Sequence, residues 1–120
     1  MTLRECYAAL GGDYDDALGW LRSEKLVNKF VLRFLDDKSY DLLCASMEAK
    51  NYEEAFRAAH TIKGVCSNLA FTMLGRSSSE LSEALRYGYT PGADELAEQV
   101  KEEYRQTVAA IRAYQEAAGG

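Results

Sequence analysis

The chain has 120 residues, of which 48% are hydrophobic and 28% charged, a balance that is typical of a globular domain and too apolar for a disordered one. Its formal net charge of −5 argues against nucleic-acid binding, because affinity for phosphate backbones comes from clustered Lys and Arg. No segment approaches the roughly 20 apolar residues of a membrane span, so we expect no contact with a membrane.

The amino terminus carries signals for two short helices. Thr2 and Glu5 have the spacing of a capping box, which predicts a helix that ends at the glycine pair Gly11 and Gly12. Asp13 then has the position and the chemistry of an N-cap residue for a second helix. We therefore expect short helices over about residues 3–21.

A long apolar stripe at helical spacing follows. It begins after Ser23, an N-cap candidate, and runs through residues 24–50. We expect one arm here, either kinked or broken near residue 38, where Ser39 could cap a fresh helix. Asn51 then precedes a helix that the pattern extends over about residues 52–70.

Two more helices complete the pattern. Thr72 is the N-cap expected for a helix that ends near Gly88. Thr90 and Pro91 have the form of an N-cap followed by proline at the first helical position, which predicts a long last helix ending near Ala117. Because the connections are short, neighbouring helices are expected to be antiparallel.

These segments predict an all-α protein. The expected architecture is an up-down-up-down four-helix bundle over about residues 24–117, with the short amino-terminal helices packed across it. No repeat or shift in composition divides residues 1–120, so we expect a single, monomeric domain. The residues expected in its core are Phe30, Phe34, Leu43, Phe56, Ile62, Leu69, Leu81, Leu85, Val100, Val108 and Ile111.

The helix expected over residues 52–70 carries the signal for function. At 100° per residue, one face collects the apolar residues that must face the core, namely Ala55, Ala59, Ile62, Cys66 and Leu69. The only histidine, His60, lies about 140° away on the exposed face. Gly64 follows one turn later, although a glycine inside a helix costs about 1 kcal/mol relative to alanine. Clearance beside His60 explains this glycine, and close packing of a second helix face is the alternative.

An accessible imidazole beside a clearing and a cation suits a transient phosphoryl group on nitrogen. Neutral imidazole carries a nucleophilic lone pair near neutral pH. Lys63 can reach an anion on His60, and Ser67 can donate a hydrogen bond there, although each can equally be an ordinary exposed residue. Without a glycine-rich nucleotide loop, the chain is expected to be a phosphoryl carrier and not an enzyme that uses ATP.

The cysteines indicate a compartment and exclude a metal cluster. Cys6, Cys44 and Cys66 are widely spaced and form no Cys-x-x-Cys pair, so we expect no metal site. Arg4 and Glu5 interrupt the apolar residues at the amino terminus, which argues against a secretory signal. Free thiols without such a signal point to the cytoplasm.

One stretch also resembles a known family. The run Ala59-His60-Thr61-Ile62-Lys63-Gly64, followed by Ser67-Asn68-Leu69-Ala70, is similar to the signature of the histidine-containing phosphotransfer (HPt) domain family. There, His-x-x-Lys-Gly precedes Leu-Gly. The chain matches this signature at His60, Lys63, Gly64 and Leu69, whereas Ala70 replaces the usual glycine. A looser similarity covers residues 24–117, with the acidic Glu80 and Glu83.

The resemblance implies a four-helix bundle that relays phosphoryl groups in two-component signalling. His60 would accept the group from a receiver-domain aspartate and pass it to another receiver or back, with Lys63 stabilising it. Gly64 would give clearance and Ser67 a hydrogen bond, while the partner would contact Arg57, Thr61 and Asn68. The implied partners are response regulator receiver domains and a hybrid sensor histidine kinase. Any Mg²⁺ would belong to the receiver, leaving this chain with no cofactor.

Other functions stay open. Residues 56–64 also resemble the amino-terminal phosphoacceptor domain of a chemotaxis-type histidine kinase, although the end of the chain at Gly120 favours the relay. A helical metalloenzyme would need Glu-x-x-His motifs, which the sequence lacks. A non-phosphorylated interaction bundle would bind its partner through aromatic surfaces, for example Tyr87 and Tyr89, and would keep that binding after His60→Gln.

Overall fold

Side-chain caps fix the amino-terminal helices α1 (Leu3–Leu10) and α2 (Tyr14–Leu21) in the computed structural model, which describes residues 1–118. The hydroxyl of Thr2 accepts a hydrogen bond from the Glu5 amide, and the Glu5 carboxylate accepts one from the Thr2 amide. Asp13 caps α2 by accepting from the Asp16 amide at 3.0 Å. The capping box and the Asp13 cap are therefore confirmed.

The first long arm is broken rather than kinked. It consists of α3 (Glu24–Arg33), a single 3-10 turn η1 (Phe34–Asp36) and α4 (Ser39–Glu48). Ser23 caps α3 as predicted, accepting from the Leu26 amide. The start of α4 is held differently from the prediction, because the Asp37 carboxylate accepts from the Ser39 amide at 2.8 Å while Ser39 is itself the first helical residue.

The three remaining arms are α5 (Tyr52–Leu69), α6 (Thr72–Leu85) and α7 (Ala93–Ala117). Asn51, which directly precedes the predicted helix, caps α5 by accepting from the Glu54 amide. Thr72 is the first residue of α6 and not its cap, since its hydroxyl donates to the Ala70 carbonyl. The end of α7 lies at the predicted Ala117, and the glycines at 119 and 120 are outside the described residues.

The predicted start of the last helix was wrong. Thr90 does not cap α7, and Pro91 does not occupy its first position, because the helix begins at Ala93. The Thr90 hydroxyl instead donates to the carbonyl of Ala84 at 2.9 Å, which ties the loop back to the end of α6. The chain then makes a turn in which the Ala93 amide donates to the Thr90 carbonyl, and α7 begins only at Ala93.

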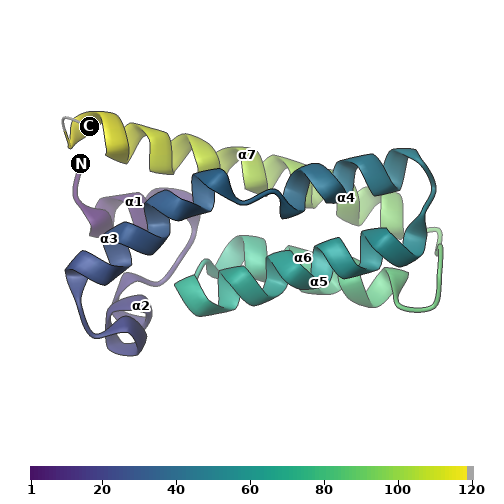
Figure 1. Cartoon of the computed structure of the whole chain (residues 1–120), viewed down its shortest axis with the longest axis horizontal. Coiled ribbons are helices and arrows are strands. Elements are labelled where there is room, and N and C mark those ends of the chain that lie inside the picture. The colour runs from purple at the N-terminus through teal and green to yellow at the C-terminus, as the bar shows by residue number, and fades with distance from the viewer. Residues whose placement is uncertain (119–120) are drawn as a thin grey trace.

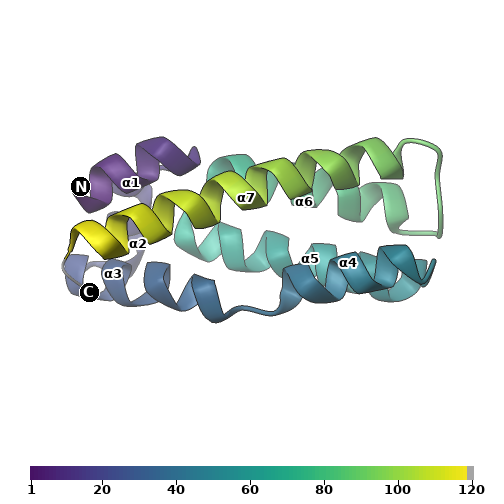
Figure 2. The ribbon, with the colours of Figure 1, turned by 90° about the horizontal axis from the view of Figure 1, so that it is seen from above.

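Successive arms run in opposite directions along the long axis of the molecule, as Figures 1 and 2 show. α5 packs between α4 and α6, and α6 packs against α7. The ring of helices closes where Tyr40 of α4 stacks on Tyr104 of α7, with ring centroids 3.9 Å apart. The short helices lie together at one end, α1 alongside the carboxyl half of α7 and α2 near α3.

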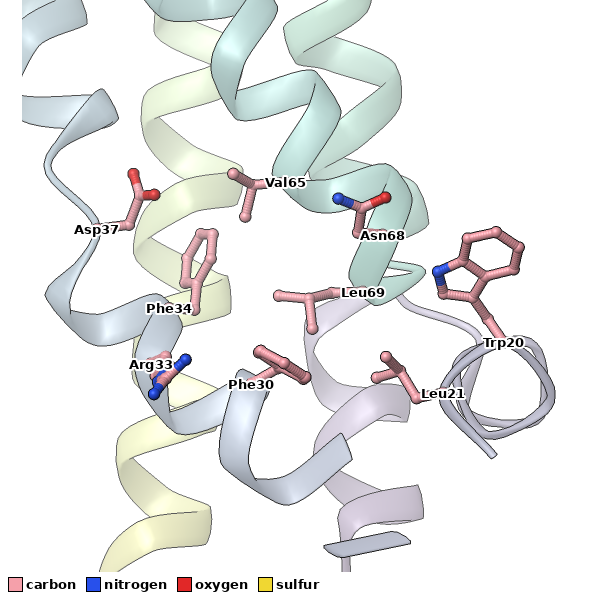
Figure 3. A pocket seen from close by; sticks show the side chains of 9 residues that line it. All are labelled: Trp20, Leu21, Phe30, Arg33, Phe34, Asp37, Val65, Asn68 and Leu69. Atoms are coloured by element: carbon pink, nitrogen blue, oxygen red, sulfur yellow. The ribbon is translucent and has the colours of Figure 1, made fainter. Parts of the chain in front are cut away.

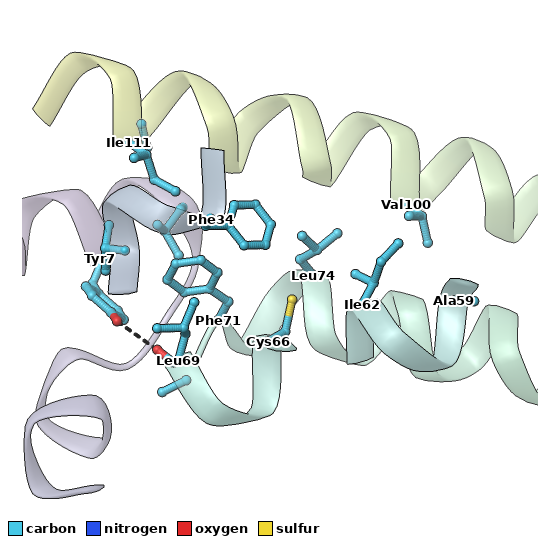
Figure 4. Packing of buried hydrophobic residues seen from close by; sticks show 14 of the residues in the cluster. Tyr7, Phe34, Ala59, Ile62, Cys66, Leu69, Phe71, Leu74, Val100 and Ile111 are labelled. Atoms are coloured by element: carbon cyan, nitrogen blue, oxygen red, sulfur yellow. Dashed lines mark hydrogen bonds between the residues drawn. The ribbon is translucent and has the colours of Figure 1, made fainter. Parts of the chain in front are cut away.

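An aromatic cluster joins the short helices to the bundle (Figure 4). Phe71 meets the rings of Tyr7 and Phe34 edge-on at 5.5 and 5.2 Å. The Tyr7 hydroxyl donates to the Leu69 carbonyl at 2.7 Å, which satisfies the end of α5. Most of the predicted core is buried, whereas three of its members are only partly buried, namely Phe30, Phe56 and Val108. None of the helices that the structure describes is long and apolar enough to cross a membrane.

Candidate functional site

The two faces of α5 differ as the sequence predicted. Ala59 and Ile62 are 0% and 3% exposed and face the other helices, whereas His60 is exposed. The helix begins with Glu53 and Glu54 in its first turn, where acidic side chains are favoured by the partial positive charge of the helix start. A well-formed helix therefore carries the His60 imidazole on its solvent side.

The His60 ring has one aromatic neighbour. Phe56, one turn earlier on α5, lies nearly parallel to it, with ring centroids 6.0 Å apart and an angle of 19° between the planes. On the Phe56 ring also lies the guanidinium of Arg86, 5.8 Å from its centroid, which Glu83 holds through two hydrogen bonds. None of the hydrogen bonds formed by residues 1–118 involves the imidazole, and His60 is exposed to solvent.

Gly64 lies beside open space. A Cβ atom built on Gly64 would have no described atom within 4 Å outside its own helix backbone. Close packing therefore does not account for this glycine, because no second helix approaches it. The structure therefore leaves open space at Gly64, one turn after His60.

Lys63 and Ser67 line a shallow hollow on one side of the exposed face, together with Asp16 of α2 and Thr72. None of the ion pairs formed by the described residues involves Lys63. Its charge is felt nearby, since the pKa of Glu83 is lowered mainly by its hydrogen bonds to Arg86 and, to a lesser degree, by Lys63. The Lys63 ammonium is thus available to an anion that arrives from solvent.

The other predicted partner contacts are differently engaged. Arg57 is exposed, but it pairs with Glu53 at 2.8 Å and with Glu54 at 2.7 Å. The Thr61 hydroxyl donates to the Arg57 carbonyl at 2.9 Å, which occupies its hydrogen. Asn68 is exposed near the carboxyl end of α5 and lines a larger pocket on the opposite side from Lys63.

The cysteines divide by burial. Burial raises the pKa of the Cys6 thiol to about 11 and that of Cys66 to about 12, whereas Cys44 is exposed. In the part of the chain that the structure describes, no three His, Cys, Asp or Glu side chains gather in a way that would hold a metal ion.

Sequence reasoning missed several residues that surround the exposed face of α5. The stacking of Phe56 was within reach, since residues four apart share a helix face, but Phe56 had been assigned to the core. Arg86 and Asp16 come from other helices, and no local pattern places them near α5.

Comparison with known proteins identifies the family of the chain. Residues 32–113, more than half of the chain, match the model of the Hpt domain family, and this stretch includes all of α5. The chain matches no curated protein and no solved structure. The matched stretch leaves out α1, α2 and most of α3. The chain belongs to the Hpt domain family, whose members take part in histidine phosphotransfer within phosphorelays.

Proposed function

We propose that this chain is a phosphoryl carrier that accepts a phosphoryl group on His60 from the aspartate of one receiver domain and passes it to another. The observation that carries this proposal is the exposed imidazole beside the open space at Gly64. A receiver must bring its active-site aspartate close to the imidazole ring, which requires such a clearing. The family of the chain supports the same reaction.

In the transfer step, the unprotonated ring nitrogen of His60 attacks the phosphorus of the aspartyl phosphate. The P–N bond forms as the P–O bond to the aspartate breaks, and the aspartate leaves as a carboxylate with the electron pair of that bond. No oxidant, reductant or water takes part, so the reverse step is the same reaction with the roles exchanged. This balance allows the carrier to return the group to either receiver.

The residues around His60 are assigned supporting roles. Lys63 would hold the phosphoryl oxygens through a charge-assisted contact, since its ammonium has no ion-pair partner among the described residues. Phe56 lies against the imidazole and limits the orientations of its ring. Any Mg²⁺ would be bound by the receiver, so the chain needs no cofactor of its own.

The setting proposed for this exchange is the cytoplasm, with the chain acting as a monomer. Three free cysteines suit a reducing compartment. The partners would be response regulator receiver domains and a hybrid sensor histidine kinase that carries one.

A labelled receiver tests the proposal. Incubation of the chain with a ³²P-phosphorylated receiver should place label on the wild-type chain that survives alkali, as an N–P bond does and an acyl phosphate does not. His60→Gln should take no label, while its melting temperature stays unchanged because His60 is exposed. Equal labelling of the His60→Gln chain would refute the assignment.

The alternative donor is an ATP-loaded kinase domain, as in a chemotaxis-type kinase. The run from Phe56 to Gly64 favours it as much as it favours the relay. Parallel reactions separate the two functions: the chain is incubated with a phosphorylated receiver in one, and with such a kinase and ATP in the other. Faster labelling by the receiver supports the relay, and labelling by the kinase alone supports the alternative.

A further inference from the structure

The helix α2 lies outside the stretch that matches the family, yet it is fixed to the end of the His60 helix. The amide of Asp13 donates to the Ala70 carbonyl at 2.9 Å. A Cβ atom on Gly12 would lie 2.7 Å from that carbonyl oxygen, so only glycine allows this approach. These contacts place α2 rigidly beside the carboxyl end of α5.

Two side chains of α2 thereby reach the two sides of the exposed face of α5. Asp16 lines the hollow that contains Lys63 and Ser67. Trp20, one turn further along α2, lines a pocket on the other side together with Asn68. The exposed surface around His60 is therefore wider than α5 alone and is extended by an element outside the stretch that matches the family.

The pocket beside Trp20 has a volume of about 470 Å³ and is mainly apolar (Figure 3). Val65 and Leu69 of α5 line it on one side, and Phe30 and Phe34 line it on the other. Trp20 stands at its open edge beside Asn68, and 71% of its surface is exposed. An aromatic side chain of this size, left in water beside a pocket, is the kind of residue that dominates binding energy in protein interfaces.

The charges around the pocket favour an apolar occupant. Arg33 and Asp37 stand at its border, one cation and one anion, so the border carries no net charge. The Arg33 guanidinium leans over the Phe30 ring at 5.7 Å, which leaves the centre of the pocket to apolar atoms. Selection at this site therefore rests on shape and apolar contact.

The mouth of the pocket lies within reach of a partner bound at His60. Asn68 follows His60 by eight residues on the exposed side of α5, which is about 12 Å along a helix that rises 1.5 Å per residue. A standard interface buries about 800 Å² on each partner, a patch roughly 30 Å across. A receiver of standard size centred on His60 would therefore reach Asn68, at the mouth of the pocket.

We propose that this pocket takes an apolar side chain of the receiver domain, and that Trp20 sets the affinity for that receiver without taking part in the chemistry. The inference rests on the proposed function of His60. A second copy of this chain is the weaker candidate, because a copy seated on the same face would cover His60 and block transfer. A receiver bound at the pocket, in contrast, places its aspartate next to the His60 ring.

Trp20→Ala tests the proposal through the dependence of the transfer rate on receiver concentration. The half-saturating concentration should rise about thirtyfold, as for truncation of an interface anchor, while the maximal rate changes less than twofold. Asn68→Trp, which would narrow the mouth of the pocket from an exposed position, should raise the half-saturating concentration as well. Tyr87→Ala is the matched control and should change neither value, since Tyr87 is 97% exposed in the loop between α6 and α7, which lies at the end of the bundle away from α2 (Figure 1).

Phosphoramidate, a small phosphoryl donor that needs no docking surface, separates a failure of the proposed function from a failure of the pocket proposal. It should label His60 equally in the wild type and in Trp20→Ala. If neither phosphoramidate nor a phosphorylated receiver labels the wild-type chain, the proposed function is wrong. If the receiver labels both chains with the same concentration dependence, or if sedimentation shows that Trp20 instead holds two copies together, the pocket proposal is wrong.

Discussion

Gly64 and Gly75 are both glycines inside helices, but their surroundings are opposite. Gly75 of α6 faces the buried side of α5, where an added Cβ atom would lie 3.2 Å from the Cβ of Cys66. Gly64 faces outward, and an added Cβ atom would meet none of the described atoms within 4 Å. The first glycine permits two helices to approach, whereas the second permits something outside the molecule to approach.

The same contrast separates the two faces of α5 as a whole. On the buried face, small residues such as Ala55 and Ala59 allow close packing, and Ile62 fills the space between the helices. On the exposed face, Gly64 has no packing partner, and the His60 ring lies beside Phe56 but is open to solvent. Changes on the first face should therefore affect stability, and changes on the second should affect transfer.

Ile62→Ala should give the largest effect, on stability alone. Ile62 is 3% exposed, and removal of a buried Ile side chain costs about 3 kcal/mol through lost burial and the cavity left behind. Urea unfolding measures this as a shift of the midpoint with an unchanged slope. Under conditions where the variant is fully folded, labelling of His60 should keep its wild-type rate, and a slower rate would show that the two faces are not independent.

Gly64→Gln should give the next effect, a loss of transfer without a loss of stability. The new side chain would occupy the approach to His60, and an obstruction of about an ångström can slow phosphoryl transfer about a hundredfold. Stability should rise by up to about 1 kcal/mol, because glycine inside a helix is unfavourable. Rapid-quench kinetics with a phosphorylated receiver gives the rate, and Gly92→Gln, at another open position, is the matched control. Transfer at the wild-type rate would leave Gly64 unexplained.

Much of this contrast was predictable from the sequence, because it depends on local rules. The spacing of Ala59, Ile62 and Cys66 determines which side of α5 is buried, and the Asn51 cap determines where the helix begins. Both rules involve residues within a few turns of each other. The exposed position of His60 followed from them directly.

The remaining features depend on contacts between segments that are distant in the sequence. Thr90 has the chemistry of a helix cap, but the Ala84 carbonyl takes its hydroxyl, and α7 begins later. The core position of Tyr7 requires the Leu69 carbonyl as partner, which no pattern near Tyr7 reveals. The pocket beside Trp20 likewise combines residues of α2, α3 and α5, and the hydrogen bond between Asp13 and the end of α5 helps to hold α2 in place there.

Lys63→Ala should have a moderate effect confined to chemistry. Loss of the ammonium removes a charge-assisted contact to the phosphoryl group, and we expect the maximal transfer rate to fall about tenfold for an exposed contact of this kind. The half-saturating receiver concentration should stay the same. The exposed Lys101 on α7 provides the control as Lys101→Ala, which should change neither value. A change in the half-saturating concentration alone would make Lys63 a docking residue.

Ala70→Gly should give the smallest effect, at the point where the buried face of α5 ends. Ala70 has φ of 56°, a left-handed conformation that costs a non-glycine residue about 1–2 kcal/mol and that glycine adopts freely. Two effects oppose this stabilisation. The unfolded chain is more flexible with glycine, and the variant loses the methyl group of Ala70, a residue that is 7% exposed and borders the hollow near Lys63. We expect a net stabilisation of about 0.5 kcal/mol in urea unfolding. The rate of His60 labelling should not change, since the Ala70 carbonyl still accepts from Asp13 and α2 stays in place. A loss of stability would mean that the methyl group stabilises the fold by more than the backbone strain at Ala70 destabilises it.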